Sequence, residues 1–151
     1  MVLKHKEEST MAKLEIDEIE IGDSHSEEVL FDLSKIQHFI EFSNDSAGIH
    51  VNDLFSKEKG FDDLVIHGFL LSTQFSRILG MEIPGENTVI GSVNLDFHSP
   101  VYVGDSINFS ATVERIIKPL GSVKLKLKAD KKDGTLCVEG KTVCVFKKLG
   151  N

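Results

Sequence analysis

The chain has 151 residues, which is enough for one domain with a hydrophobic core. Its composition, 40% hydrophobic and 27% charged, is that of an ordinary water-soluble globular protein. The formal net charge of −7 argues against general nucleic-acid binding, which needs a basic face. The longest nearly uncharged run, residues 69–79, is too short to span a membrane. We therefore expect neither a nucleic acid nor a membrane as a partner.

Charge is distributed unevenly along the chain. Residues 7–32 contain ten acidic side chains and one basic side chain, whereas residues 124–151 contain eight basic and three acidic ones. The simpler interpretation is two solvated surfaces. The alternative is that the later lysines help to hold an anionic ligand.

Cys137 and Cys144 are the only cysteines, and seven residues of one strand would separate them too far for a disulfide. We expect free, buried thiols, which fit a reducing, cytoplasmic location. Residues 1–12 lack the apolar core of a secretory signal and are expected to form a disordered extension. Residues 13–151 are expected to form a single domain.

The first part of the chain predicts short strands and one helix. Residues 13–21 alternate loosely and predict a short strand, and residues 29–31 predict another. Asp32 and Ser34 are candidate N-caps for a helix that runs to about residue 43.

A polar segment and a buried helix follow. Residues 43–50 contain too many Asn, Asp, Ser and Gly side chains to continue the first helix. Residues 68–79 are nearly uncharged and predict a buried helix that ends at Gly80. The side chains expected to be buried together on this helix are Phe69, Leu70, Phe75, Ile78 and Leu79.

The remainder predicts four antiparallel strands, at about residues 88–98, 106–117, 122–129 and 136–146. Asp133-Gly134 is a hairpin turn signal, and a disturbed alternation near Gly140 predicts a bulge. Meander strands beside one apolar helix predict an α+β fold, in which a curved antiparallel sheet wraps around the helix.

Candidate catalytic residues lie on either side of residues 51–66. Asp45 and His50 place a carboxylate and an imidazole five residues apart, but such pairs are common and can also be a turn cap and a surface histidine. Gly68 would present an unobstructed backbone N–H at the positive end of the buried helix, where an oxyanion could bind. His67 is interpreted first as a structural histidine at the start of that helix.

Three segments together resemble the MaoC-like, R-specific enoyl-CoA hydratases. The segments are D-S-A-G-I-H at 45–50, V-I-H-G-F-L-L-S-T-Q-F-S-R-I-L-G at 65–80, and V-N-L-D-F-H-S-P-V-Y-V-G-D at 93–105. The resemblance extends from about residue 18 to residue 114. It implies a hot-dog fold.

The resemblance also implies an activity. Water would add to C3 of a trans-2-enoyl thioester, activated by Asp45 and His50, while the Gly68 N–H polarises the thioester carbonyl. Ser76 would support the catalytic pair, as would His67. The substrate would be a thioester of CoA or of acyl carrier protein, without a metal or other cofactor, and the family pattern implies a homodimer.

The chain departs from the family motif Asp-x-Asn-Pro-x-His at Ala47-Gly48, where the orienting amide and the rigid proline are both missing. This departure keeps open the alternative of a non-catalytic acyl-thioester-binding protein. A thioesterase, another chemistry of the same fold, is a further alternative. Arg77 and the lysines of residues 124–148 are candidate contacts for CoA phosphates.

Overall fold

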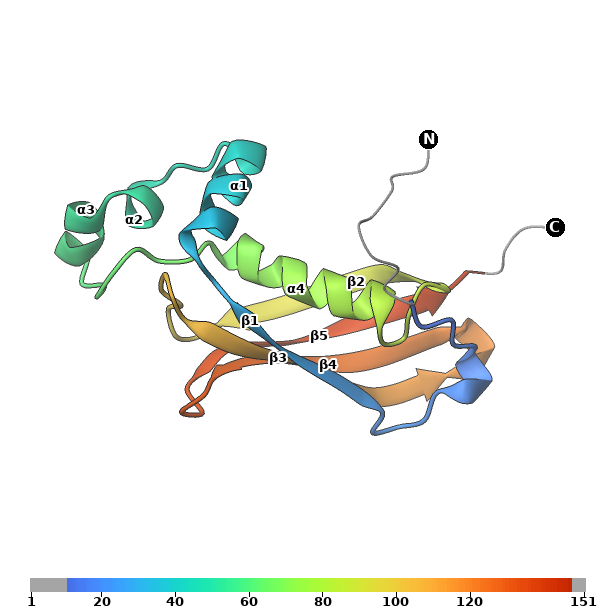
Figure 1. Ribbon diagram of the computed structural model, residues 1–151. Helices are drawn as coiled ribbons and strands as arrows, with labels where there is room; N and C mark the ends of the chain where they lie inside the picture. The colour runs from blue at the N-terminus through green and yellow to red at the C-terminus, as the bar shows by residue number, and fades with distance from the viewer. Residues whose placement is uncertain (1–10, 148–151) are drawn as a thin grey trace.

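The computed structural model describes residues 11–147 and is built on one five-stranded antiparallel sheet (Figure 1). The spatial order of the strands is β1-β3-β4-β5-β2, so β1 and β2 form the two edges. The strands are β1 (Ser24–Leu30), β2 (Thr88–Phe97), β3 (Ser106–Ile117), β4 (Ser122–Lys131) and β5 (Leu136–Phe146).

One long helix, α4 (Gly68–Met81), lies along the inner face of the curved sheet (Figure 1). Its buried side chains are Leu70, Leu71, Phe75, Ile78 and Leu79. The Phe75 ring meets Phe109 of β3 edge-on, at a centroid distance of 5.2 Å. On β4, buried Val123, Leu125 and Leu127 alternate with exposed lysines. These three apolar side chains form the opposite wall of the core.

Three shorter helices project beyond one end of the sheet, beside the start of α4 (Figure 1). They are α1 (Leu33–Ser43), α2 (Gly48–Val51) and α3 (Asp53–Glu58). The Asp32 carboxylate caps α1 by accepting from the Lys35 N–H, and the Asn52 side chain caps α3 by accepting from the Phe55 N–H. The polar segment expected after residue 43 thus forms the link from α1 to α2.

The main expectations for the fold are confirmed. The sheet is antiparallel and wraps around a central helix, and Gly134 turns the last hairpin with a φ of +86°. Cys137 and Cys144 are free and buried. Among residues 11–147, no helix has the length and hydrophobicity needed to cross a membrane.

Three local expectations are wrong. Residues 13–21 form no strand; they contain a 3-10 helix, η1 (Ile16–Glu18), whose start is closed by a capping box between Glu15 and Glu18, and only Lys13 makes an isolated bridge, to Gly85. Phe69 is 82% exposed, since it points from α4 toward β2 rather than into the core, where Leu71 lies instead. The irregularity of β5 lies at Cys137, between the pairs Ala129–Val138 and Asp130–Leu136, and not at Gly140. Gly140 is in regular register with Leu95, and a glycine is needed there because a Cβ would collide with the Asn94 carbonyl oxygen.

Most of the predicted N-terminal extension, residues 1–12, lies outside the described residues. Its last two positions are described, and Ala12 is hydrogen-bonded at the end of α4. The Ala12 N–H donates to the Met81 carbonyl, and the Ala12 carbonyl accepts from the Glu86 N–H.

Candidate active site

Asp45 is positioned by the turn that ends α1. Asn44 adopts the left-handed conformation, with φ of +58°, and its N–H donates to the Ile40 carbonyl. The chain therefore reverses, and the Asp45 N–H meets the Ser43 hydroxyl oxygen at 3.1 Å. Asp45 Oδ1 accepts from the Ala47 N–H at 3.2 Å. Although Ala47 lacks the side-chain amide of the family motif, its backbone therefore still orients the carboxylate. The Asp45 side chain is 49% exposed and can contact a ligand.

His50 lies on α2, with its ring directed by the backbone of residue 65. Its Nδ1 lies 2.6 Å from the Val65 carbonyl oxygen. Because a carbonyl oxygen only accepts, Nδ1 carries the proton and Nε2 keeps its lone pair. The Val65 N–H in turn donates to the Ile49 carbonyl, so two hydrogen bonds fasten α2 to this segment. His50 is therefore held in the tautomer that a base acting through Nε2 requires.

His67 lies beneath His50, just before α4. Its side chain is only 2% exposed, and its Nε2 donates to the Asp45 carbonyl oxygen at 3.0 Å. The His50 and His67 rings stack with centroids 3.7 Å apart, and Phe39 packs on His67 at 4.8 Å. Burial is the largest cause that lowers the pKa of His67, and the neighbouring His50 lowers it further. His67 is thus a neutral histidine that joins the two parts of the site.

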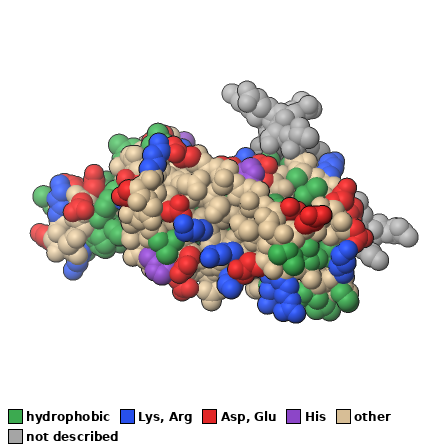
Figure 2. All heavy atoms as spheres, turned by 90° about the horizontal axis from the view of Figure 1, so that it is seen from below, with side chains coloured by type: hydrophobic (Ala, Val, Ile, Leu, Met, Phe, Trp, Pro, Cys, Tyr) green, Lys and Arg blue, Asp and Glu red, His purple; other side chains and the backbone are tan. Residues whose placement is uncertain are grey.

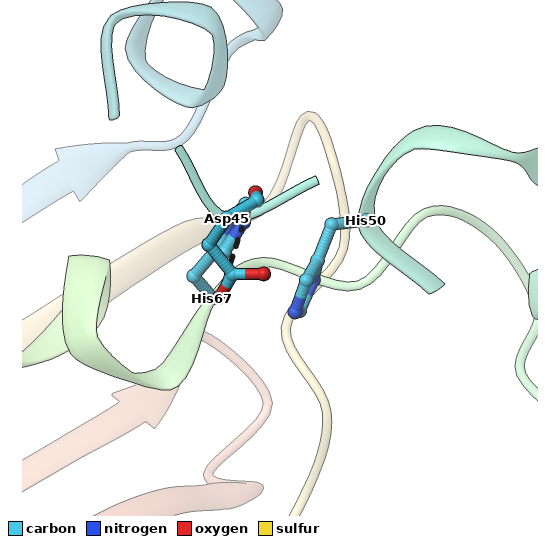
Figure 3. A group of neighbouring side chains, drawn as sticks. All are labelled: Asp45, His50 and His67. Atoms are coloured by element: carbon cyan, nitrogen blue, oxygen red, sulfur yellow. Dashed lines mark hydrogen bonds and ion pairs between the residues drawn. The ribbon is translucent and has the colours of Figure 1, made fainter. Parts of the chain in front are cut away.

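Asp45 and His50 point toward a common space above His67 (Figure 3). One ligand atom from each of the three residues lies within 4.8 Å of the others. A metal ion fits this group poorly, because His67 Nε2 and His50 Nδ1 already donate to carbonyls. Of the atoms that remain, His67 Nδ1 is buried without a hydrogen-bond partner among the described residues, whereas His50 Nε2 and the Asp45 carboxylate are acceptors at the site. A water molecule between these two acceptors could donate to both.

A cavity of about 410 Å³ opens beside His50. Gly68 lines it at the first position of α4, where the helix leaves the backbone N–H without an intrahelical partner. A Cβ at Gly68 would lie 3.0 Å from the Phe97 ring, so the glycine lets that ring approach the amide. The cavity therefore combines a base, a free amide donor and largely apolar walls. The other lining residues are Ile49, Phe61, Val65, Ile66, Leu71, Phe97, His98, Ser99, Pro100 and Val101.

The structure brings together Asp45, His50, His67 and Gly68, but not Ser76. Ser76 lies two turns further along α4, in a separate apolar groove of about 420 Å³ beside β2. The groove is lined by Phe69, Ser72, Phe75, Ser76, Leu79, Ile90, Val93, Leu95 and Phe97. Phe97 lines both the groove and the cavity, so the two spaces meet at its ring.

The residues expected to contact CoA phosphates do not line the cavity beside His50 in a single chain. Arg77 is paired with both Glu27 and Glu82. Lys124 and Lys126 project from β4 on the face of the sheet opposite to α4. On that face basic and acidic side chains lie next to one another (Figure 2), as in the Lys141–Glu114 pair. This face is consistent with a solvated surface.

Sequence reasoning missed the groups that orient the histidines. Val65 acts through its carbonyl, which no side-chain pattern reports, and the packing of Phe39 on His67 joins residues from different elements. The proximity of Phe97 to Gly68 likewise depends on how β2 lies against α4.

Comparison with solved structures identifies the class of fold. The structure of an (R)-hydratase from A. caviae, described as involved in PHA biosynthesis, superposes with a TM-score of 0.81, at 26% identity over 85% of this chain and 98% of that chain. The unliganded R-hydratase PhaJ1 from Pseudomonas aeruginosa also reaches 0.81, at 20% identity over 91% of this chain and 92% of that chain. The fold is a hot-dog fold, as the resemblance implied.

The sequence comparisons identify the family. Residues 17–133 match the family model described as the MaoC like domain, and the chain belongs to this family. An (R)-specific enoyl-CoA hydratase of Aeromonas caviae is 28% identical over 83% of this chain and 93% of its own length. A mitochondrial 3-hydroxyacyl-(acyl-carrier-protein) dehydratase of Solanum lycopersicum is 31% identical over 74% of this chain and 67% of its own.

Proposed function

We propose that this protein is an (R)-specific enoyl-thioester hydratase, which also catalyses the reverse dehydration of a 3-hydroxyacyl thioester. The observation that carries the proposal is the grouping of Asp45 with His50, whose ring also borders the cavity that Gly68 lines. The names of the relatives support the same chemistry. CoA and acyl carrier protein are both candidate carriers of the acyl group.

The chemistry follows from the proposed roles. A water molecule held by Asp45 and His50 loses one proton to the pair and forms a bond from its oxygen to C3. The electrons of the C2=C3 double bond move toward the thioester, whose oxygen gains charge and accepts from the Gly68 N–H. A proton then passes from the pair to C2, and the 3-hydroxyacyl thioester is complete.

The test is the loss of enoyl-thioester absorbance with crotonyl-CoA and with a longer enoyl-CoA. Asp45→Asn and His50→Gln are each expected to lower kcat about 100- to 10,000-fold, the range of general acid–base catalysis. Exposed His38 on α1 supplies the control His38→Gln, which should retain activity. Product analysis should give an (R)-3-hydroxyacyl thioester. Release of free CoA would instead indicate a thioesterase, and substrate binding without product would indicate a binding protein.

We also propose that the active unit is a homodimer joined along β2. Among residues 11–147, this strand pairs with β5 alone and exposes apolar side chains beside the groove on α4. A second copy paired edge to edge would cover both. Cytoplasmic location and a role in fatty-acid metabolism are the setting we propose for this activity.

A further inference from the structure

The helix that carries His50 has little to stabilise it from within. α2 contains only four residues, and its N-cap, Ala47, has no side chain that can cap it. Its backbone hydrogen bonds run from the His50 N–H to the Ala47 carbonyl and from the Asn52 N–H to the Gly48 carbonyl. A single turn of this kind is marginal by itself, so its geometry must be fixed by packing.

The packing comes from Phe55 of α3, whose ring lies directly on Gly48. A Cβ at Gly48 would lie 2.6 Å from Phe55 Cδ1 and 2.9 Å from Phe55 Cε1. Such distances are far inside van der Waals contact, so no side chain at position 48 fits while the ring stays in place. Glycine at this position is therefore matched to the aromatic ring of Phe55.

Phe55 is itself held firmly. Its N–H donates to the Asn52 side chain that caps α3. The next residue, Ser56, is fully buried, and its hydroxyl donates to the Asp63 carbonyl at 2.7 Å. Phe55 is 38% exposed, and Lys59 Nζ stands 5.2 Å from the centroid of its ring. The ring thus connects α2 to an anchored helix.

We propose that Phe55 is a positioning residue of the active site, which holds α2 so that the His50 ring stays between the Val65 carbonyl and His67. The Phe55 ring packs on α2 at Gly48. The hydrogen bonds of Val65 with His50 Nδ1 and with the Ile49 carbonyl hold α2 at a second place. In the family motif a proline makes the position of Gly48 rigid. In this chain the contact between Phe55 and Gly48 supplies that rigidity instead. The inference rests on the proposed function for its effect on turnover, but not for its effect on the structure.

Phe55→Ala should lower kcat about tenfold or more, because small displacements of a catalytic group are costly, and should change KM less than about twofold. Phe55→Tyr keeps the ring and should restore most of kcat. Leu54→Ala is the matched control, since Leu54 neighbours Phe55 on α3 and is 74% exposed. Gly48→Ala must displace the ring; it should lower kcat similarly, and adding it to Phe55→Ala should cause little further loss.

Amide hydrogen exchange gives a measurement that needs no turnover. In Phe55→Ala the amides of His50 and Asn52 should exchange about tenfold faster, whereas those of the sheet core keep their rates. Unchanged exchange in these two amides would overturn the proposal, as would an unchanged kcat or a loss confined to KM. If the wild type turns over no enoyl thioester, the proposed function fails, and exchange alone decides the role of Phe55.

Discussion

At the scale of single residues, the two histidines of the site differ in what surrounds them. His50 borders the cavity and keeps a free Nε2, whereas His67 is enclosed and uses its Nε2 to hold the Asp45 carbonyl. The same residue type therefore supplies a candidate base in one place and a structural donor in the other. This division keeps His67 neutral, because burial of its ring disfavours the charged form and lowers its pKa.

The neutral state of His67 makes stability depend on pH. In the unfolded chain its pKa is near 6.5, and burial lowers it in the folded protein. Between these two values the unfolded chain binds more protons, so the free energy of unfolding rises with pH in that window. Above pH 6.5 the stabilisation is fully present, and it is lost as the pH falls through the folded pKa. Urea unfolding from about pH 5 to about pH 7.5 measures this slope.

His67→Gln removes the titrating group but keeps a side-chain N–H for the Asp45 carbonyl. Its unfolding free energy should therefore vary less with pH than that of the wild type. His38→Gln, at an exposed position, is the control and should keep the wild-type slope. Equal slopes for His67→Gln and the wild type would show that the pH dependence comes from other groups.

Gly68 offers a second test at this scale. In Gly68→Ala the new methyl group would press on the Phe97 ring at 3.0 Å, and we expect kcat to fall about tenfold. The loss should be smaller than the roughly 100- to 1,000-fold cost of removing an oxyanion donor, because the amide itself remains. Gly80→Ala is a matched control on the same helix, since its Cβ would meet open space. It should retain activity and stabilise the protein by about 0.5–1 kcal/mol.

At the scale of the elements, the C-terminus of α1 decides where the site begins. Asn44 turns the chain in the left-handed conformation directly before Asp45. Asn44→Ala should destabilise the protein by about 1 kcal/mol and lower kcat, because alanine disfavours this conformation. Asn44→Gly should leave the unfolding free energy within about 0.5 kcal/mol of the wild type. Equal destabilisation by both substitutions would show that the Asn44 side chain, rather than its backbone conformation, matters.

The elements also differ in how far their sequences predict them. α4 and the strands β2 to β5 were predictable because their apolar patterns report burial directly, as the alternation of β4 does, whereas β1 was expected only at residues 29–31. The pairing of Asp45 with His50 was expected from the family resemblance, since the five-residue spacing alone is a common pattern. The contacts of His67, Phe55 and Phe97 were not, since each joins residues from different elements through the tertiary fold. The error at Phe69 has the same origin, because α4 has a second apolar side that faces β2.

At the scale of the whole molecule, the exposed edge of the sheet is the feature that a single chain leaves unexplained. β2 is ten residues long, yet eight of its residues are exposed in the monomer. Four of these are large and apolar, namely Val89, Ile90, Val93 and Phe97. Long apolar edge strands promote association, and natural proteins usually protect them with charge or cover. Dimerisation through β2 would provide the cover and would also enclose the groove that contains Ser76.

The corresponding prediction concerns the oligomeric state and its link to activity. Wild-type protein should have the mass of a dimer in size-exclusion chromatography with light scattering. Val93→Lys places a charge on the proposed interface and should shift the mass to that of a monomer, with loss of turnover if the neighbouring chain completes the site. Leu120→Lys is the control, because Leu120 is also exposed and lies in η2 (Lys118–Leu120), between β3 and β4 rather than on β2, and should leave the dimer intact. A wild-type monomer with full activity would contradict the dimer, and the groove beside β2 would then be open to solvent in the working enzyme.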